Sequence, residues 1–486
     1  MNQQHTYQRR LSSVAHVGNI AIGGDNPIRI QSMNTTDTND TEASVAQAKR
    51  IIDAGGELVR LTTQGSREAE NMKNISARLK QDGYTAPLVA DVHFNANVAD
   101  VAARYCEKVR INPGNYVDPA RTFKHLEYTD EEYQAELQRI EERLVPFINI
   151  CKEHHTAVRI GVNHGSLSDR IMSRYGDTPE GIVESCMEFL RIFRRHDFSD
   201  VVISIKASNT VVMVSSVRLL VKAMDREDMH YPLHLGVTEA GEGEDGRIKS
   251  AVGIGALLTE GIGDTIRVSL SEEPECEIPV ARKLVELIPE CARLRAEAEQ
   301  SIKDDTITLA LDAPDWETFQ LKAAMAVGAL LIDRKATKLK LIENSEWRME
   351  NYDYTCNEKA VITTSEKTNS KTNHNSQFSI LHSQLVGIIT DGDIRRAMQR
   401  LGASFFETKV EEIMSRDPKT ISKDAKIVEA GEKMNHHSIH TLIVMDTNPS
   451  SLPCGEGQGG GSNAASYVVV GVIDSFSCLP GTRFYH

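Results

Sequence analysis

Several features that would assign this chain to a common class are missing from its sequence. No stretch approaches the roughly 20 apolar residues of a membrane-spanning helix. No apolar run follows the two arginines near the N-terminus, as one would in a secretory signal. We therefore expect a cytoplasmic protein that does not insert into a membrane.

Closely spaced cysteines are also missing. Eight cysteines are scattered along 486 residues, the closest pair is Cys276 and Cys291, and no C-x-x-C occurs. This spacing argues against a disulfide framework and against a thiolate metal site. We predict reduced thiols and no metal ligands in this chain.

An excess of positively charged residues is missing as well. The chain has 55 Lys+Arg against 69 Asp+Glu, a formal net charge of −14. Proteins that coat nucleic acids need basic stripes to neutralise phosphates, so we expect no nucleic-acid partner. A local basic pocket is still compatible with this balance.

What the sequence does have, from about residue 26, is a repeated alternation of a short β-rich run with an amphipathic helical stretch. Strands that alternate with helices pair in parallel, and eight such units predict a closed (β/α)8 TIM barrel. The eight runs are IRIQSM (28–33), ELVRLTT (57–63), PLVADV (87–92), KVRINP (108–113), AVRIGVN (157–163), VVISIKAS (201–208), LHLGVTE (233–239) and DTIRVSLS (264–271).

Further segments lie outside a minimal barrel. A long charged helix is expected between residues 116 and 155, and residues 306–333 read as a partial second α/β piece. Thr, Ser, Asn and Lys dominate a later stretch, which predicts a polar, poorly ordered linker, and a small α/β module follows it. The predicted domains are 1–295 (barrel), 296–350 (partial α/β domain), 351–382 (linker) and 383–486 (C-terminal module).

Polar side chains gather near the C-terminal ends of the predicted strands, where TIM barrels build their active sites. Arg110 and Asn112 alternate with Val109 and Ile111, so both should face the barrel mouth. The polar residues at these strand ends are Arg60, Asp91, Arg110, Asn112, Arg159, Asn163, Lys206, Glu239, Arg267 and Ser269.

Five basic groups against two acids leave an excess of positive charge at this rim. A buried charge is costly unless it is paired, and arginine suits bidentate recognition of phosphate. The strand ends therefore predict a phosphate or diphosphate site. The alternative is a set of structural ion pairs.

Other motifs carry weaker signals. DVHF contains Asp91 and His93, but no third metal ligand follows at a telling spacing. Thr390 and Asp393 precede a predicted helix with capping-box spacing. They are interpreted either as a helix cap or as a weak nucleotide contact.

The motifs PIRIQSMNTTDTND, VADVHFN, KVRINPGN, RIGVNHGSL, ISIKASN, LGVTEAG and GDTIRVSLS occur in this order. Together they resemble the 4-hydroxy-3-methylbut-2-enyl diphosphate synthases of the non-mevalonate isoprenoid pathway. The resemblance runs from about residue 7 to 333. It favours the larger form of that enzyme, which carries an extra domain after its barrel.

The resemblance implies an oxidoreductase that opens and dehydrates 2-C-methyl-D-erythritol 2,4-cyclodiphosphate, with ferredoxin or flavodoxin as electron donor and a possible homo-oligomeric state. It implies catalytic roles for Asp91, Asn163 and Glu239, the last as candidate acid/base. The substrate-binding residues that it implies are Arg60, Arg110, Asn112, Arg159, Lys206, Arg267 and Ser269.

The family also implies a [4Fe–4S] cluster held by three cysteines and a glutamate, and the closely spaced cysteines of that pattern are absent here. From about residue 384 the chain instead resembles cystathionine-β-synthase-type (CBS) repeats, most like those of arabinose 5-phosphate isomerases. Three hypotheses follow: a synthase that needs a cluster domain from another chain, a non-catalytic binding protein for phosphometabolites or nucleotides, and a truncated or fused product without an integrated function.

Overall fold

The computed structural model divides into two units, Met1–Arg348 and Met349–His486, and each is described here by itself. In the first unit the described residues are 7–92, 95–117, 128–238, 240–241 and 243–343. In the second they are 361–364, 384–388, 412, 415–416, 419–422, 424–425, 429, 433, 441–446 and 468–474.

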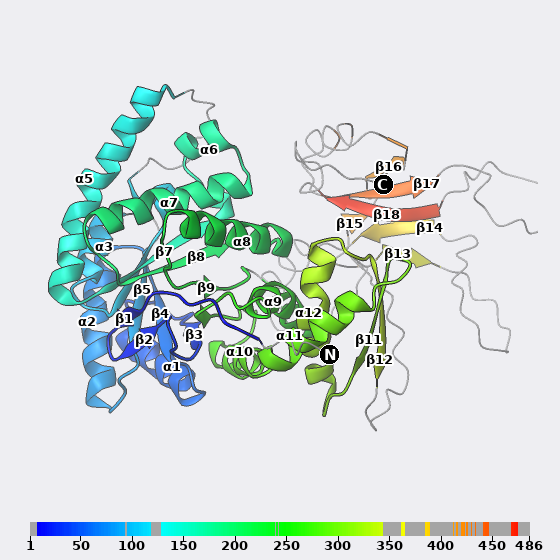
Figure 1. The fold of residues 1–486 in the computed structure, drawn as a ribbon, viewed down its shortest axis with the longest axis horizontal. Helices are drawn as coiled ribbons and strands as arrows, with labels where there is room; N and C mark the ends of the chain where they lie inside the picture. Colours follow the sequence, from blue (N-terminus) through cyan, green and yellow to red (C-terminus); the bar gives the residue numbers. More distant parts are fainter. Residues whose placement is uncertain are drawn as a thin grey trace, which may run out of the picture. The chain divides into compact units, whose positions relative to one another are not determined.

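Eight parallel strands form the centre of the first unit (Figure 1). Their order is β8-β7-β6-β5-β4-β3-β10-β9, and a parallel bridge between Ile203 and Leu233 joins the two ends. The predicted (β/α)8 barrel is thereby confirmed. The strands are β3 (Arg29–Met33), β4 (Leu58–Thr63), β5 (Leu88–Val92), β6 (Lys108–Ile111), β7 (Ala157–Asn163), β8 (Val201–Lys206), β9 (His234–Leu235) and β10 (Thr265–Ile266).

The last two strands are shorter than their sequence runs suggested. Beyond Leu235 and Ile266 only scattered backbone bonds continue, such as Arg267 N–H to the Leu235 carbonyl and Thr238 N–H to the Ala207 carbonyl. The chain therefore leaves regular pairing early and opens toward the C-terminal end of the barrel.

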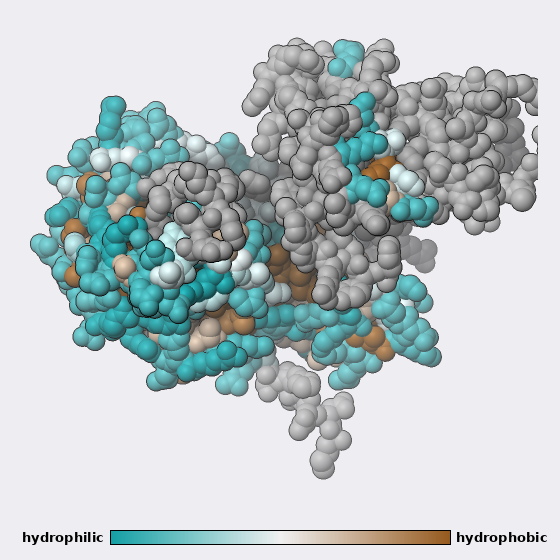
Figure 2. Space-filling model, turned by 90° about the horizontal axis from the view of Figure 1, so that it is seen from above, coloured by the Kyte–Doolittle hydropathy of each residue, from teal (hydrophilic) through white to brown (hydrophobic). Residues whose placement is uncertain are grey.

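Helices cover the outside of the sheet and mostly begin with side-chain caps at that same end. Asp40, Thr178 and Asn209 each accept hydrogen bonds from the first amides of their helices, which satisfies donors that a helix start leaves unpaired. The helices after the strands are α1 (Thr41–Asp53), α2 (Ser66–Gln81), α3 (Ala96–Ala102), α5 (Asp130–His154), α7 (Pro179–Arg195), α8 (Thr210–Arg226), α9 (Gly243–Leu258) and α10 (Glu277–Glu286). On the side of the molecule that Figure 2 shows, the described surface is mainly hydrophilic.

A hairpin that the sequence analysis did not anticipate closes the other end of the barrel. Strands β1 (Ala15–Val17) and β2 (Ile20–Ile22) pair antiparallel, and Gly18 in their turn has a φ of 57°, a conformation that favours glycine. The hairpin packs against the first inward side chains of four strands. This apolar floor consists of Ala15, Val17, Ile22, Leu58, Val89, Ala157 and Val202.

The connections after β6 and β7 carry most of the added structure. The predicted long charged helix is α5, which a capping box of Thr129 and Glu132 starts. The short helices α4 (Pro113–Tyr116) and α6 (Asp169–Tyr175) lie between strands and main helices. On α7, buried Glu188 accepts two bonds from Arg170 and one from Tyr133 of α5, so α5 is anchored to the barrel layer.

The predicted partial α/β piece follows α11 (Ile288–Gln300). It consists of β11 (Thr306–Leu311), α12 (Trp316–Ile332) and β12 (Lys338–Glu343), and the two strands pair in parallel. Helix α12 packs on α9 of the barrel. In the described residues no helix is both long and apolar enough to cross a bilayer.

The second unit is described only through its strands and a few further residues. Strands β13 (Val361–Thr364), β14 (Gln384–Ile388) and β15 (Ser415–Arg416) form one sheet, and β16 (Thr420–Ser422), β17 (Thr441–Asp446) and β18 (Val468–Asp474) form another. Strand β13 falls within the segment 351–382 that we expected to be linker. Its run VITT is rich in β-branched residues, which favour strands, and it pairs with β14. The polar residues on both sides of this short run led to the prediction of a linker.

Candidate active site

Alternate residues of each strand point into the barrel, and above the apolar floor most of them are polar. Asp91 on β5 is paired in register with Arg110 on β6, and Arg110 with Arg159 on β7. Side chains at such positions share one face of a sheet. The order of the strands thus brings Asp91 and Arg159 together, although they are 68 positions apart in the sequence.

One carboxylate serves three of these arginines. Asp91 Oδ2 lies 3.3 Å from Arg60 Nε, and Asp91 Oδ1 lies 3.4 Å from Arg110 Nη1 and 3.7 Å from Arg159 Nη2. All four side chains are buried. Because one negative charge faces three positive ones, the cluster keeps a net positive charge in a water-poor environment.

A fourth arginine has a carboxylate of its own. Arg267 donates to Glu277 through Nε (3.0 Å) and Nη2 (2.9 Å). Glu277 is buried at the start of α10 and also accepts from Ser32 Oγ at 2.7 Å. Glu277 was not among the predicted site residues, because it lies at the start of a helix and not at the end of a strand.

The electrostatics of the interior reflect this excess of positive charge. Burial lowers the pKa of Arg60 to about 10, even though Asp91 opposes the shift. Burial, together with the neighbouring arginines, also lowers the pKa values of Arg159 and Lys206 well below their usual range. An anion placed among these groups would stabilise their charged forms.

Two further titratable groups in the interior were missed. Lys108 on β6 and His234 on β9 are buried among the same cations. The signal was present in the sequence: Lys108 precedes Arg110 by two residues, so it shares the inward face of that strand. Lys108 was not predicted because it lies at the start of its strand, whereas the predicted site residues are at the strand ends.

The predicted site residues Asn112, Asn163 and Ser269 lie at the rim of the barrel, and each has different neighbours. Asn112 caps α4 through a bond from Gly114 N–H (3.3 Å) and donates to Ser166 Oγ (2.9 Å). Asn163 ends β7 in register with Lys206, and Ser269 is half-buried beyond β10. Asn112 therefore ties two rim loops together, in addition to any role toward a ligand.

The segment Pro113-Gly114-Asn115, which follows β6 after Asn112, forms the first part of α4. A Cβ on Gly114 would lie 1.7 Å from the Ser166 carbonyl oxygen. The backbones after β6 and β7 therefore approach so closely that only glycine fits. Four predicted residues, Glu239, His93, Thr390 and Asp393, lie outside the described residues.

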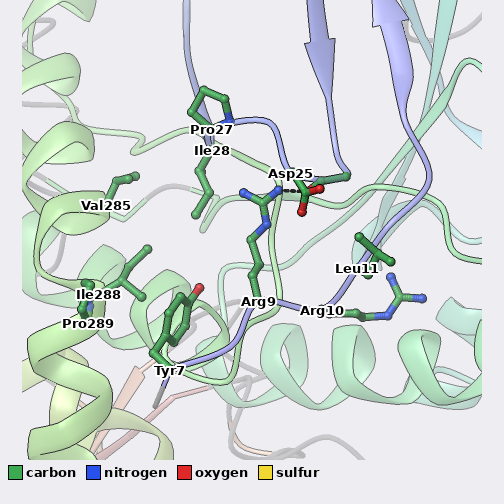
Figure 3. A pocket seen from close by; sticks show the side chains of 11 residues that line it. Tyr7, Arg9, Arg10, Leu11, Asp25, Pro27, Ile28, Val285, Ile288 and Pro289 are labelled. Atoms are coloured by element: carbon green, nitrogen blue, oxygen red, sulfur yellow. Dashed lines mark hydrogen bonds between the residues drawn. The ribbon is translucent and has the colours of Figure 1, made fainter.

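Another hollow, of about 410 Å³, lies at the opposite end of the barrel (Figure 3). Apolar side chains such as Ile28, Val285 and Ile288 form one of its sides, and the guanidinium of Arg9 donates to the Gly24 carbonyl. The charged group nearest the middle of this hollow is thus already engaged by the backbone. It offers less to an anion than the barrel interior does.

The described cysteines do not fit an iron–sulfur cluster. Burial raises the pKa of both Cys106 and Cys291 to about 12, whereas cluster ligands are thiolates. Of the five described cysteines only Cys276 is exposed. Within the described ranges no three His, Cys, Asp or Glu side chains are grouped to hold a metal. Cys356, Cys454 and Cys478 lie outside those ranges.

The fold and the interior together define a (β/α)8 barrel with a cationic, polar centre. Residues 12–282, more than half of the chain, match the GcpE TIM-barrel domain, and the chain belongs to that family. Residues 410–449 match the CBS domain. Both resemblances stated from the sequence motifs are thereby confirmed at the level of the family.

Close relatives carry a consistent name, 4-hydroxy-3-methylbut-2-en-1-yl diphosphate synthase (flavodoxin). The protein of Bacteroides fragilis is 76% identical over 282 residues, covering 58% of this chain and 45% of the relative. The proteins of Phocaeicola vulgatus and Akkermansia muciniphila are 74% and 55% identical, with 58% of this chain and 46% and 48% of the relatives covered. The match thus spans less than half the length of these relatives.

Proposed function

We propose that the barrel binds 2-C-methyl-D-erythritol 2,4-cyclodiphosphate as the substrate-binding part of a 4-hydroxy-3-methylbut-2-enyl diphosphate synthase. The observation that carries the proposal is the contact of one carboxylate, Asp91, with three buried guanidiniums. A dianionic ligand would neutralise the remaining charge. The names of the relatives print the product, 4-hydroxy-3-methylbut-2-en-1-yl diphosphate, and the family resemblance implies the cyclic diphosphate as the substrate.

The arginines would bind the two phosphate groups, and Lys206 would add a point charge. Arginine is suited to this task because its planar donors match phosphate oxygens in pairs. Ser269 and Asn163, which lie at the rim, would contact the ligand by hydrogen bonds. Glu239 stays our candidate acid/base, and Asp91 would position the guanidiniums.

Reductive ring opening requires two electrons, which side chains do not supply. Since the described cysteines do not fit a cluster, we propose that turnover needs a cluster-bearing domain from another chain. Flavodoxin, which the relatives' names print, is the proposed electron donor. We expect the chain alone, treated with iron and sulfide, to give no product.

Calorimetry with the cyclic diphosphate tests the binding step. Replacing Arg110 by alanine removes a charge-assisted contact, so the binding free energy should weaken by about 1.5–3 kcal/mol. Arg139→Ala, on the exposed side of α5, is the matched control and should bind like the unmodified chain. Equal affinity for the Arg110→Ala variant and the unmodified chain would contradict the proposal.

A second candidate function, binding of a phosphorylated metabolite without catalysis, is favoured by the CBS match at residues 410–449. The two candidates differ in one measurement. Addition of a separate cluster-bearing domain and reduced flavodoxin yields product only if the barrel is catalytically competent.

A further inference from the structure

Besides Arg110, whose Nε belongs to the arginine cluster above, five further inward side chains, one from each of five strands, have buried polar atoms without hydrogen-bond partners among the described residues. They are Gln31 (both amide atoms), Lys108 (Nζ), Arg159 (Nε and Nη1), Ser204 (Oγ) and His234 (Nε2). Each of these residues is at most 1% exposed. We call this set the deep ring.

So many unpaired polar groups in one place are unusual for a folded protein. Buried polar atoms nearly always have a partner, and each exception calls for an explanation. Leaving one without a partner costs about 1–3 kcal/mol, and more for a charged group. The clustering of the exceptions around one axis indicates that they face a common occupant.

The position of the deep ring shows from which side that occupant comes. The ring borders the apolar floor, since Gln31 is paired in register with Leu58 and Lys108 with Val89 and Ala157. A polar ligand therefore reaches the ring from the side of the arginines. Lys108 precedes Arg110 by two residues, which places its Cα about 6–7 Å deeper along the strand. Its long side chain can extend back toward the arginines, whose charge already acts on it.

The chemistry of the ring selects an anion. It contains an amine, a guanidinium, an imidazole, an amide and a hydroxyl, all of which can donate hydrogen bonds, and the nearest carboxylate, Asp91 beside Arg159, is already shared among three arginines. A cationic or purely apolar ligand would leave these donors unsatisfied. An oxyanion supplies acceptors in several directions.

We propose that the deep ring is the inner end of the diphosphate site and that Lys108 donates a hydrogen bond to the innermost phosphate oxygen. This inference rests on the proposed function, because it assumes that the diphosphate binds among the arginines. It adds a positioning residue that lies below the strand ends. It also has a consequence for protons.

The groups that face Lys108 decide its charge before a ligand arrives. Arg159 on β7 and Arg60 on β4 act on it, and its charge acts on His234 of β9. The other titratable groups of this interior are Asp91 on β5, Arg110 on its own strand and Lys206 on β8. Burial first, and then Arg159 and Arg60, lower the pKa of Lys108 well below its usual range. Without a ligand these surroundings favour the neutral form of Lys108, and an incoming anion would raise its pKa and favour uptake of a proton.

Isothermal titration calorimetry of the full chain at pH 8, in two buffers of different ionisation enthalpy, measures this proton. Each phosphorus of the cyclic diphosphate carries one strongly acidic group only, so the ligand itself contributes no proton at this pH. We expect net proton uptake when the ligand binds. Lys108→Met should reduce this uptake and weaken binding about 10- to 100-fold.

Two controls separate the possible outcomes. Lys222→Met removes a lysine that is exposed on α8 and should leave both uptake and affinity unchanged. Thermal unfolding without ligand should show Lys108→Met to be at least as stable as the unmodified chain, since methionine removes a buried, unpaired amine.

Binding with equal affinity and equal proton uptake in Lys108→Met would overturn this inference while leaving the proposed function intact. Failure of the unmodified chain to bind the diphosphate would refute the proposed function itself.

Discussion

Replacing Asp91 by asparagine tests whether one carboxylate holds the barrel interior together. The change keeps the shape of the side chain and removes its charge. Arg60, Arg110 and Arg159 then lose the carboxylate that lies 3.3 to 3.7 Å from them. No described acid other than Glu277, which Arg267 engages, is buried in this part of the barrel.

The size of the effect follows from two opposing terms. At an effective dielectric constant of about 20, each pair at these separations attracts by about 5 kcal/mol. Removal of the ions from water costs several kcal/mol each and offsets much of that gain. Removing one partner of a buried pair typically costs about 3–5 kcal/mol, and we expect the free energy of unfolding to fall by that amount.

Urea denaturation of the full chain, followed by circular dichroism, measures this loss. Asp100→Asn is the matched control, because Asp100 pairs with a partly exposed Arg143, a contact worth at most about 1 kcal/mol. An unfolding free energy for Asp91→Asn within about 1 kcal/mol of the unmodified value would refute the reasoning. It would mean that the arginines are held by the fold and not by this charge.

Three further predictions follow from the same geometry. Gly114→Ala should disrupt the rim and lower the melting temperature, because the added Cβ would meet the Ser166 carbonyl. Gly165→Ala is the control and should leave the melting temperature unchanged, because the space around Gly165 is open. Equal melting temperatures of the two variants would contradict this prediction. The lowered folded-state pKa of Lys108 means that the unfolded chain binds more protons as pH approaches about 10 from below, so stability should rise with pH there. Lys108→Met should reduce this slope by up to about 1.4 kcal/mol per pH unit, and identical slopes in the two proteins would contradict the lowered pKa. The C-terminal module should bind AMP or ATP weakly or not at all, and a micromolar affinity that Asp393→Ala abolishes would show the opposite.

Periodicity in the sequence was sufficient to predict the barrel. Eight β-rich runs alternate with amphipathic helices, and each of the eight contains a strand of the structure. Apolar residues recur every two residues in a strand and every 3.6 residues in a helix. This periodicity is a local property, so it can be recognised in the sequence without knowledge of the fold. The shared face of Arg110 and Asp91 also follows, because the ends of parallel strands meet at one rim.

The sequence could not predict the hairpin at the base of the barrel. Its two strands have only three residues each, too few for a clear alternation. What holds them is contact with Leu58, Val89, Ala157 and Val202, which are far away in the chain. Such short strands acquire their structure from tertiary packing.

The charge balance of the site was likewise decided by tertiary structure. Sequence alone identified the cations at the strand ends and their excess over acids. Only the fold could assign Asp91 to three arginines, Glu277 to Arg267, and Lys108 to a place without a described partner. Residue types and spacing determine which groups can face the barrel axis, whereas burial and distance, which set their pKa values, exist only once the eight strands have closed.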